Sequence, residues 1–419
     1  MLKYICILLV VIASEVIAKS MFPLPRLQNI CTQTSVRRDI ISLPQDELQR
    51  FIAVVREMHR RGWMDGFGSM HDHIAHQIHG NEQFFAWHRR FLRHFELLMQ
   101  EIDPGVMLPY WNWGTYWQSP VADPVLTSAY FGGNGRLGDN CVVEGAQARW
   151  GRNYPSRNCL TRRFRYGATT GAFWPMRAVR DVMNTAKTHA QFRSRIENGA
   201  HGIVHLGLGG DFETMYAPVD VLFFMHHATI DKIWAEWQSR DPLRYRQVDG
   251  YDSQRIPVTA NSLMPFYSEE VGTALATNGP GYCYVYDDVP AAPMGAMFKS
   301  TRRAAFSSFK AAVNSTAPVE QQAQDTEDAD DDSVAAPAAA AAAAPAGNEF
   351  HVKHALNDTA DFRPPSPMSR EWLKGRHMDV AEAARMQALV NNVVAQINTE
   401  RRQKRAAAAA AAAAAVRAA

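Results

Sequence analysis

Residues 84–102 read FFAWHRRFLRHFELLMQEI and indicate the fold class of this 419-residue chain. Apolar side chains recur here at intervals of three and four residues, which predicts one long amphipathic helix that ends before Pro104. Residues 223–237, FFMHHATIDKIWAEW, repeat this arrangement, and residues 45–59 fit a third helix. Because alternating strand patterns are sparse, we expect a mostly α-helical bundle with long loops and few short strands.

The composition supports a large buried core and excludes some classes of partner. Hydrophobic residues make up 47% of the chain, and 44 Lys and Arg against 42 Asp and Glu leave a formal charge of +2. Binding to nucleic acid through counterion release needs a concentrated basic surface, so no nucleic-acid partner is expected. No stretch is long and apolar enough to span a membrane, which takes about 20 residues.

Four segments that differ in amino-acid composition follow one another along the chain. Residues 1–18 resemble a signal peptide, with Lys3 before a short apolar run and small residues at the end, so the chain is expected to be secreted or to lie in the secretory lumen. Residues 19–290 have a globular composition. Residues 291–348, rich in Ala, Pro and acidic residues, are expected to form a partly disordered linker. Residues 349–419 form an extension with one amphipathic helix between Ser369 and Asn398.

The cysteines suggest disulfides in an oxidising compartment. If the first 18 residues are removed with Cys6, four cysteines remain, and four allow three pairings. Cys141 and Cys159 share one loop-like stretch, which favours that pair and leaves Cys31 with Cys283.

Histidines occur in two groups, and these groups indicate the function. The first comprises His71, His73, His76, His79 and His88, and the second comprises His201, His205, His226 and His227. A spacing of four, as between His201 and His205, places two imidazoles on one helix face where both can reach one ion. An isolated histidine on an apolar face is usually a hydrogen-bonded core residue. Crowded neutral imidazoles, however, would be costly to bury without a cation. The spacing alone does not separate zinc, copper, iron and nickel.

Two longer motifs around these histidines resemble those of a known family. Residues 79–92, HGNEQFFAWHRRFL, precede residues 108–113, LPYWNW. Residues 201–210, HGIVHLGLGG, precede residues 220–238, DVLFFMHHATIDKIWAEWQ. In this order they resemble the two copper motifs of the type 3 copper proteins, the tyrosinases, catechol oxidases and haemocyanins. The likeness covers residues 28–290 and is greatest to secreted tyrosinase-like proteins of fungal type.

The resemblance implies two copper ions and a set of site residues. His71, His79 and His88 would bind the first ion, with His73 and His76 competing with His71 in a stretch that has little helical pattern. His201, His205 and His227 would bind the second ion, and His226 would lie behind them. Phe223 would pack over the second ion, Asp231 would brace its helix, and Glu197 would orient a water near the substrate.

A Tyr motif at the end of the globular part resembles the segment that closes this domain. Residues 282–286 read YCYVY, and the resemblance implies that one of these rings stacks on an Arg near the N-terminus, either Arg37 or Arg38. An edge strand fits the same residues. A cation above an aromatic ring contributes about 0.5–2 kcal/mol.

Two departures from the family pattern bear on activity. Gln77 stands where many relatives carry a Cys that crosslinks to the second ligand. Gly202 stands where tyrosinases often carry an Asn, so deprotonation of a monophenol is expected to be harder. The implied activity is oxidation of phenols by dioxygen, with ortho-diphenols favoured over monophenols. The alternative is a haemocyanin-like oxygen carrier or a latent proenzyme, in which a bulky residue such as Phe306, Phe309 or Phe350 would cover the site. The sequence leaves the oligomeric state open.

Overall fold

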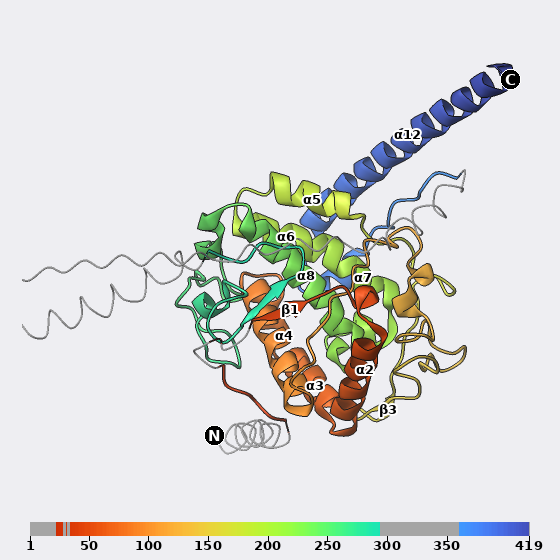
Figure 1. The fold of residues 1–419 in the computed structure, drawn as a ribbon. Helices are drawn as coiled ribbons and strands as arrows, with labels where there is room; N and C mark the ends of the chain where they lie inside the picture. The colour runs from red at the N-terminus through yellow and green to blue at the C-terminus, as the bar shows by residue number, and fades with distance from the viewer. Residues whose placement is uncertain (1–21, 28–30, 32–33, 294–359, 419) are drawn as a thin grey trace, which may run out of the picture. The chain divides into compact units, whose positions relative to one another are not determined.

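The computed structural model describes residues 22–27, 31, 34–293 and 360–418, so the expected signal peptide and linker lie outside the described residues (Figure 1). The long helices are α2 Gln45–Arg60, α3 Trp63–Ile78, α4 Gln83–Ile102, α5 Met176–Thr185, α6 His189–Ile196, α7 Gly202–Leu208, α8 Leu222–Ser239 and α12 Val380–Ala418. Shorter segments are α11 Arg370–Lys374, the π-helix η4 Glu197–His201 and the 3₁₀ turns η1 Ile40–Ser42, η2 Pro120–Ala122, η3 Pro124–Leu126, η5 Gly210–Glu213, η6 Ala217–Val219, η7 Pro242–Arg246 and η8 Val271–Ala274. The expected mostly helical class is confirmed.

Helices α4 and α8 pack against each other at the centre of the bundle, and α2 and α3 pack on α4 (Figure 1). The structure differs here from the amphipathic helix expected for residues 84–102, because α4 is buried on almost every side. Its charged residues stay buried because they find partners: Arg89 pairs with Asp231 at 2.6 Å, and Arg93 with Glu96 at 2.8 Å. Buried charges are tolerated when they are paired and hydrogen-bonded.

Helix α3 covers residues 63–78, where the sequence showed little helical pattern. Gly66 and Gly68 weaken the helical signal because glycine is a poor helix former. Both glycines allow close packing: a Cβ at Gly66 would lie 2.6 Å from the Phe22 ring, and one at Gly68 would lie 2.6 Å from Val219. The tertiary contacts therefore fix a helix that the sequence pattern only weakly indicates.

Two small sheets complete the described part of the chain. Strand β1 Ser35–Arg37 pairs in parallel with β4 Tyr284–Tyr286, and β2 Gly151–Arg152 pairs antiparallel with β3 Asn158–Cys159. The disulfides are Cys31–Cys283 and Cys141–Cys159, so the expected pairing is confirmed. The first disulfide lies beside the β1–β4 pair and ties the N-terminal segment to the end of the globular part.

The pairing of β1 with β4 also shows which of the two candidates, Arg37 or Arg38, stacks on the Tyr motif. The guanidinium carbon of Arg37 lies 3.5 Å from the centre of the Tyr284 ring, and Arg37 is fully buried. Arg38 lies at the surface and pairs with Glu47. Asp231 accepts hydrogen bonds from the hydroxyls of Tyr284 and Tyr286, which fits its expected bracing of α8.

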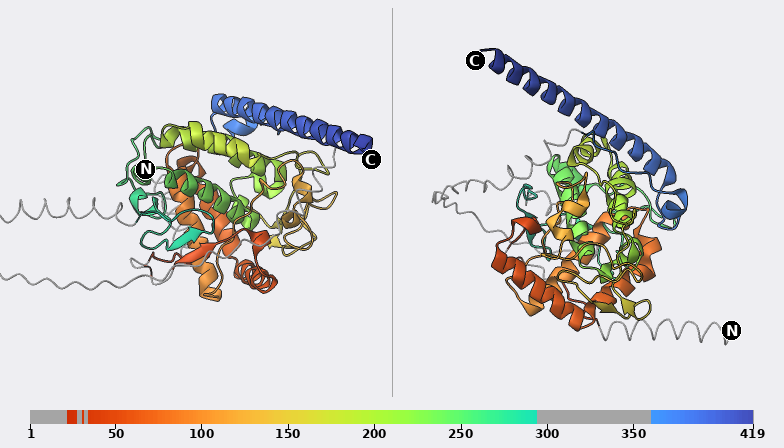
Figure 2. Two further views of the ribbon diagram at one scale, coloured as in Figure 1. Left: turned by 45° about the horizontal axis from the view of Figure 1, so that its top comes forward. Right: turned by 90° about the vertical axis from the view of Figure 1, so that its right-hand side faces the viewer.

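Among the described residues, 362–418 form one compact unit with those up to residue 293. Helix α12 packs on α5, α6 and η4, and its C-terminal half extends beyond these helices (Figure 2). The helical pattern expected between Ser369 and Asn398 corresponds to α11 and the first half of α12. Among the described residues, no helix is both long and apolar enough to cross a membrane.

Candidate metal centre

Five helical elements bring the six expected ligands together in the core. His71 lies on α3, His79 directly follows it, and His88 lies on α4. His201 ends the π-helix η4, His205 lies on α7, and His227 lies on α8. Single turns of π-helix are frequent at functional sites. All six side chains are buried, with relative exposures between 1% and 8%.

The first group contains His71, His79 and His88, whose ligand nitrogens lie within 4.8 Å of one another. The Nε2 atoms of His71 and His88 are 3.2 Å apart. The competitors His73 and His76 also lie on α3, but both are exposed. Since α3 turns only one face to the core, the structure places His71 in the group and the other two at the surface.

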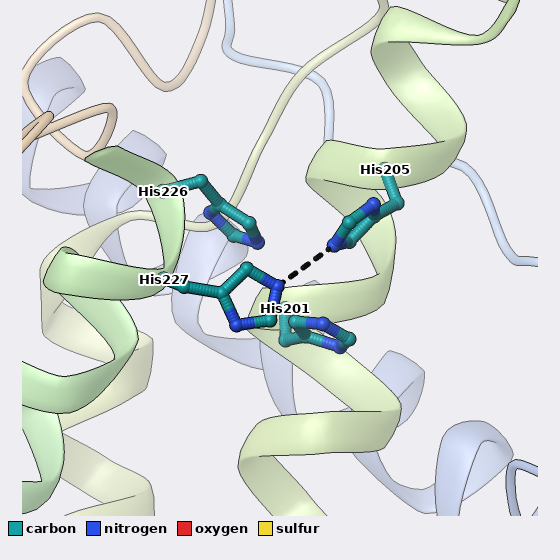
Figure 3. Close-up of side chains that lie close together, drawn as sticks. All are labelled: His201, His205, His226 and His227. Carbon is teal, nitrogen blue, oxygen red and sulfur yellow. Dashed lines mark hydrogen bonds between the residues drawn. The ribbon is translucent and has the colours of Figure 1, made fainter. Parts of the chain in front are cut away.

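The second group contains His201, His205, His226 and His227, whose ligand nitrogens also lie within 4.8 Å of one another (Figure 3). The Nε2 atoms of His205 and His227 are 3.3 Å apart. His226 was expected behind the ligands, but its ring nitrogen lies within the same 4.8 Å as those of the other three. Its ring stacks on that of His201 with the centres 5.5 Å apart.

The two groups face each other across a short gap. The rings of His88 and His227 stack with their centres 4.5 Å apart. The Phe223 ring stacks on His227 at 4.0 Å and lies 5.1 Å from His71, so it touches ligands of both groups. Two ions bound to these groups would therefore be neighbours in an apolar, aromatic surrounding.

Backbone carbonyl groups fix the protonation of the imidazoles. A carbonyl oxygen can only accept, so each Nδ1 that meets one carries the proton and leaves Nε2 with a free lone pair. The pairs are His71 with Met215, His79 with Ala75, His88 with Phe84, His201 with Glu197 and His205 with Phe212. His71 and His88 therefore turn two Nε2 lone pairs toward each other at 3.2 Å, and these repel each other unless a cation lies between them. The donor set therefore fits two copper ions, since imidazole is a good ligand for copper.

Burial keeps these imidazoles neutral. It lowers the pKa of His79 to about 4 and that of His205 to about 3. Burial also lowers the pKa of His71, His88 and His227 well below its ordinary value, and neighbouring imidazoles lower it further. Neutral imidazoles are the form that binds a metal ion.

Glu197 lies beside the second group but is engaged by protein partners. Its carboxylate accepts a hydrogen bond from the Gly80 backbone N–H at 2.8 Å and from Arg193 at 2.9 Å. Arg193 also bonds to Glu82, which in turn bonds to His189. This buried network joins the segment after His79 to the π-helix that carries His201, and the sequence motifs gave no sign of it.

The open side of the centre is covered by residues 362–379, which we call the strap. A cavity of about 20 Å³ lies between strap and imidazoles, which is room for a water-sized molecule and far too little for a phenol ring. It is lined by His71, His79, His201, His205, Glu213, Thr214, Met215, Trp372, Arg376 and Met378. Phe306, Phe309 and Phe350, the expected covering residues, lie outside the described residues. One signal for the strap was present in the sequence, because Trp372 is the only Trp beyond residue 237.

Comparisons with known proteins agree with this geometry. Residues 51–240 match the family model of the common central domain of tyrosinase. The tyrosinase of Streptomyces antibioticus is 33% identical over 235 residues, covering 50% of this chain and 84% of the relative. Grixazone synthase of Streptomyces griseus is 27% identical over 292 residues, covering 56% and 94%. A polyphenol oxidase variant from Thermothelomyces thermophila shares the fold, with a TM-score of 0.51 and 20% identity over 60% of this chain and 88% of that chain.

Proposed function

Because the chain belongs to the tyrosinase family of type 3 copper proteins, we propose that His71, His79 and His88 bind one copper ion and that His201, His205 and His227 bind the other. The chain is a copper-dependent phenol oxidase. The observation that carries the ligand assignment is the convergence of Nε2 atoms in two neighbouring groups, at 3.2 Å between His71 and His88 and at 3.3 Å between His205 and His227.

The reaction takes two electrons from each ring. Two copper ions held by these imidazoles would supply the redox chemistry for the oxidation of phenols by dioxygen. Two ortho-diphenols give two ortho-quinones, and one dioxygen takes up the four electrons and four protons to form two waters. The protein holds and orients the imidazoles, and hydrogen bonds to backbone carbonyls orient five of the six proposed ligands.

Phe223 and Glu197 have supporting roles in this proposal. The Phe223 ring touches imidazoles of both groups, and it limits the access of water and offers a flat apolar surface to an incoming ring. Glu197 holds the Gly80 backbone and thereby the loop after His79. Its second task, orienting a water for deprotonation of a phenol, requires that the strap leaves the site.

The preference for ortho-diphenols rests on Gly202. This residue directly follows His201 and offers no side-chain acceptor to a phenolic proton. A monophenol must lose this proton before it is hydroxylated, whereas an ortho-diphenol only delivers electrons and protons. We therefore expect a higher rate with catechols than with matched monophenols.

The strap favours a latent form of the same enzyme as the second candidate. In the described conformation Trp372, Arg376 and Met378 of the strap line the cavity at the imidazoles, and its volume of about 20 Å³ is close to that needed by one water molecule. A permanent oxygen carrier would share this closed state. The latent oxidase and the oxygen carrier differ once the strap is displaced, because only the oxidase then turns over phenols.

We also propose that the chain is secreted. The apolar N-terminal segment supports export, and the two disulfides fit an oxidising compartment.

The test uses copper-loaded full-length protein and measures oxygen uptake with a catechol and the matching monophenol. A strap variant with Trp372 and Met378 both replaced by Ala opens the site, and we expect catechol turnover to rise in it. Gly202→Asn should raise the monophenol rate relative to the catechol rate, with Gly202→Ala as the control for added volume. Oxygen binding without turnover in the opened variant would support the carrier and refute the oxidase, and equal ratios in both Gly202 variants would refute the diphenol argument.

A further inference from the structure

Helix α12 contributes to the main hydrophobic core of the copper-binding unit. Met386, Val390, Val393 and Val394 are at most 5% exposed and belong to the same core cluster as the aromatic residues of α4 and α8. The helix contacts α5, α6 and η4. Since η4 is the π-helix that ends at His201, the helix buttresses the segment that presents a copper ligand.

Polar contacts fix the same helix at two points along its length. Glu382 pairs with Arg195 of α6 at 3.5 Å, and Glu400 pairs with Arg177 of α5 at 2.7 Å. The second pair is largely exposed and contributes little by itself. The less exposed pair, Glu382 with Arg195, links α12 to α6, the helix that leads into η4.

The strap is attached to α12 and to the rest of the unit. The backbone of Phe362 exchanges two hydrogen bonds with the side chain of Asn398, at 2.8 and 2.9 Å. The Gln387 side chain donates to the Pro365 carbonyl at 2.6 Å. Arg165, outside the strap, donates to the carbonyl of Pro367 at 2.7 Å. The start of the strap is therefore held by the helix that follows its end.

Two glycines next to copper ligands form the seat of the strap. A Cβ at Gly80, directly after His79, would lie 2.1 Å from the His377 carbonyl oxygen. A Cβ at Gly202, directly after His201, would lie 2.7 Å from the Met378 methyl and 3.0 Å from the Met368 sulfur. A side chain at Gly80 would push the His377 backbone of the strap away, whereas a methyl group at Gly202 would only require the ends of the Met378 and Met368 side chains to shift.

We infer that residues 362–401 are a permanent part of the copper-binding unit: they hold the π-helix of His201 in place and stay docked when the chain is cut between residues 294 and 359. A cut there leaves the strap over the site. This inference rests on the proposed assignment of His201 as a ligand.

The experiment inserts a specific protease site within residues 294–359 of the full-length chain and cuts the folded, copper-loaded protein. Size-exclusion chromatography at micromolar concentration, mass spectrometry and copper analysis then follow both fragments. We expect the C-terminal fragment to co-elute with the N-terminal one, two copper ions per complex and no rise in catechol turnover. Loss of the fragment with both copper ions retained would overturn the inference.

A pair of helix variants tests the role of the core contact. Replacing Val390 and Val394 together by Ala removes buried volume, and after the cut it should weaken retention of the fragment at least about tenfold and lower the copper content. Asn392→Ala, an exposed change on the same helix, should alter neither. Equal retention and equal copper in both variants would contradict the inference. Retention and copper content do not depend on turnover, so this outcome stays separate from failure of the proposed oxidase activity.

Discussion

Replacing Arg37 by Met tests the closure of the copper-binding unit at β1 and β4. The Arg37 guanidinium is fully buried and donates to both carboxylate oxygens of Glu96 at 3.1 and 3.0 Å. It also donates to the Tyr286 hydroxyl at 3.2 Å and lies over the Tyr284 ring. Met keeps much of the volume but none of these interactions.

The expected loss of stability follows from the Glu96 charge that stays buried without Arg37. Breaking a buried ion pair by removing one partner costs about 3–5 kcal/mol, because an uncompensated charge is left in the core. The lost cation–π contact adds about 1–2 kcal/mol. Glu96 keeps Arg93 at 2.8 Å, which offsets part of the loss. We therefore expect the free energy of unfolding to fall by about 3–5 kcal/mol.

The assay is urea unfolding of copper-free protein with intact disulfides, with Arg38→Met as the control. Arg38 is the next residue, but its pair with Glu47 lies at the surface, where such pairs contribute about 0.2–1 kcal/mol. Similar losses in the two variants would refute the reasoning.

The same variant should also change the acid sensitivity. Burial alone would raise the pKa of Glu96, but Arg37 and Arg93 lower it below its ordinary value of 4.5. The ionised carboxylate therefore stabilises the fold above about pH 4.5, and this contribution is lost as the pH falls through the lower, folded-state pKa. Without Arg37 the loss should begin at a higher pH, and an unchanged acid midpoint would contradict this.

Three further changes test the centre, the strap and a buried imidazole. His227→Gln should reduce copper from two ions to one per chain while His226→Gln leaves two, as measured by elemental analysis; the opposite result would exchange their roles. Gly80→Ala should displace the strap at the His377 carbonyl and raise catechol turnover several-fold without altering the ratio of monophenol to catechol rates, so an unchanged turnover would contradict this contact. Burial, assisted by a neighbouring Arg, lowers the pKa of His94 to about 3. Below about pH 6.5 the unfolded chain therefore binds a proton at this imidazole that the folded chain does not bind, and the free energy of unfolding decreases as the pH falls from about 6.5 to about 3. In His94→Gln this part of the pH dependence, a few kcal/mol at about 1.4 kcal/mol per pKa unit, should disappear from urea unfolding measured against pH.

The sequence by itself determined the helical bundle and most of the metal centre. Periodicity within residues 84–102 and 223–237 is local information, and it places His88 and His227 on faces that must be buried. The two histidine groups and their family resemblance then indicated six ligands, because metal binding requires particular side chains at particular spacings.

Only the tertiary structure decided what depends on contacts between distant segments. It placed His71 in the core and left His73 and His76 exposed, because packing against Phe22 and Val219 fixes a helix that its own glycines disfavour. It chose Arg37 over Arg38, since only the β1–β4 pairing defines which side chain points inward. It brought the strap onto the imidazoles, nearly 170 residues beyond His201 along the chain, where no local pattern can report which surface an extension covers.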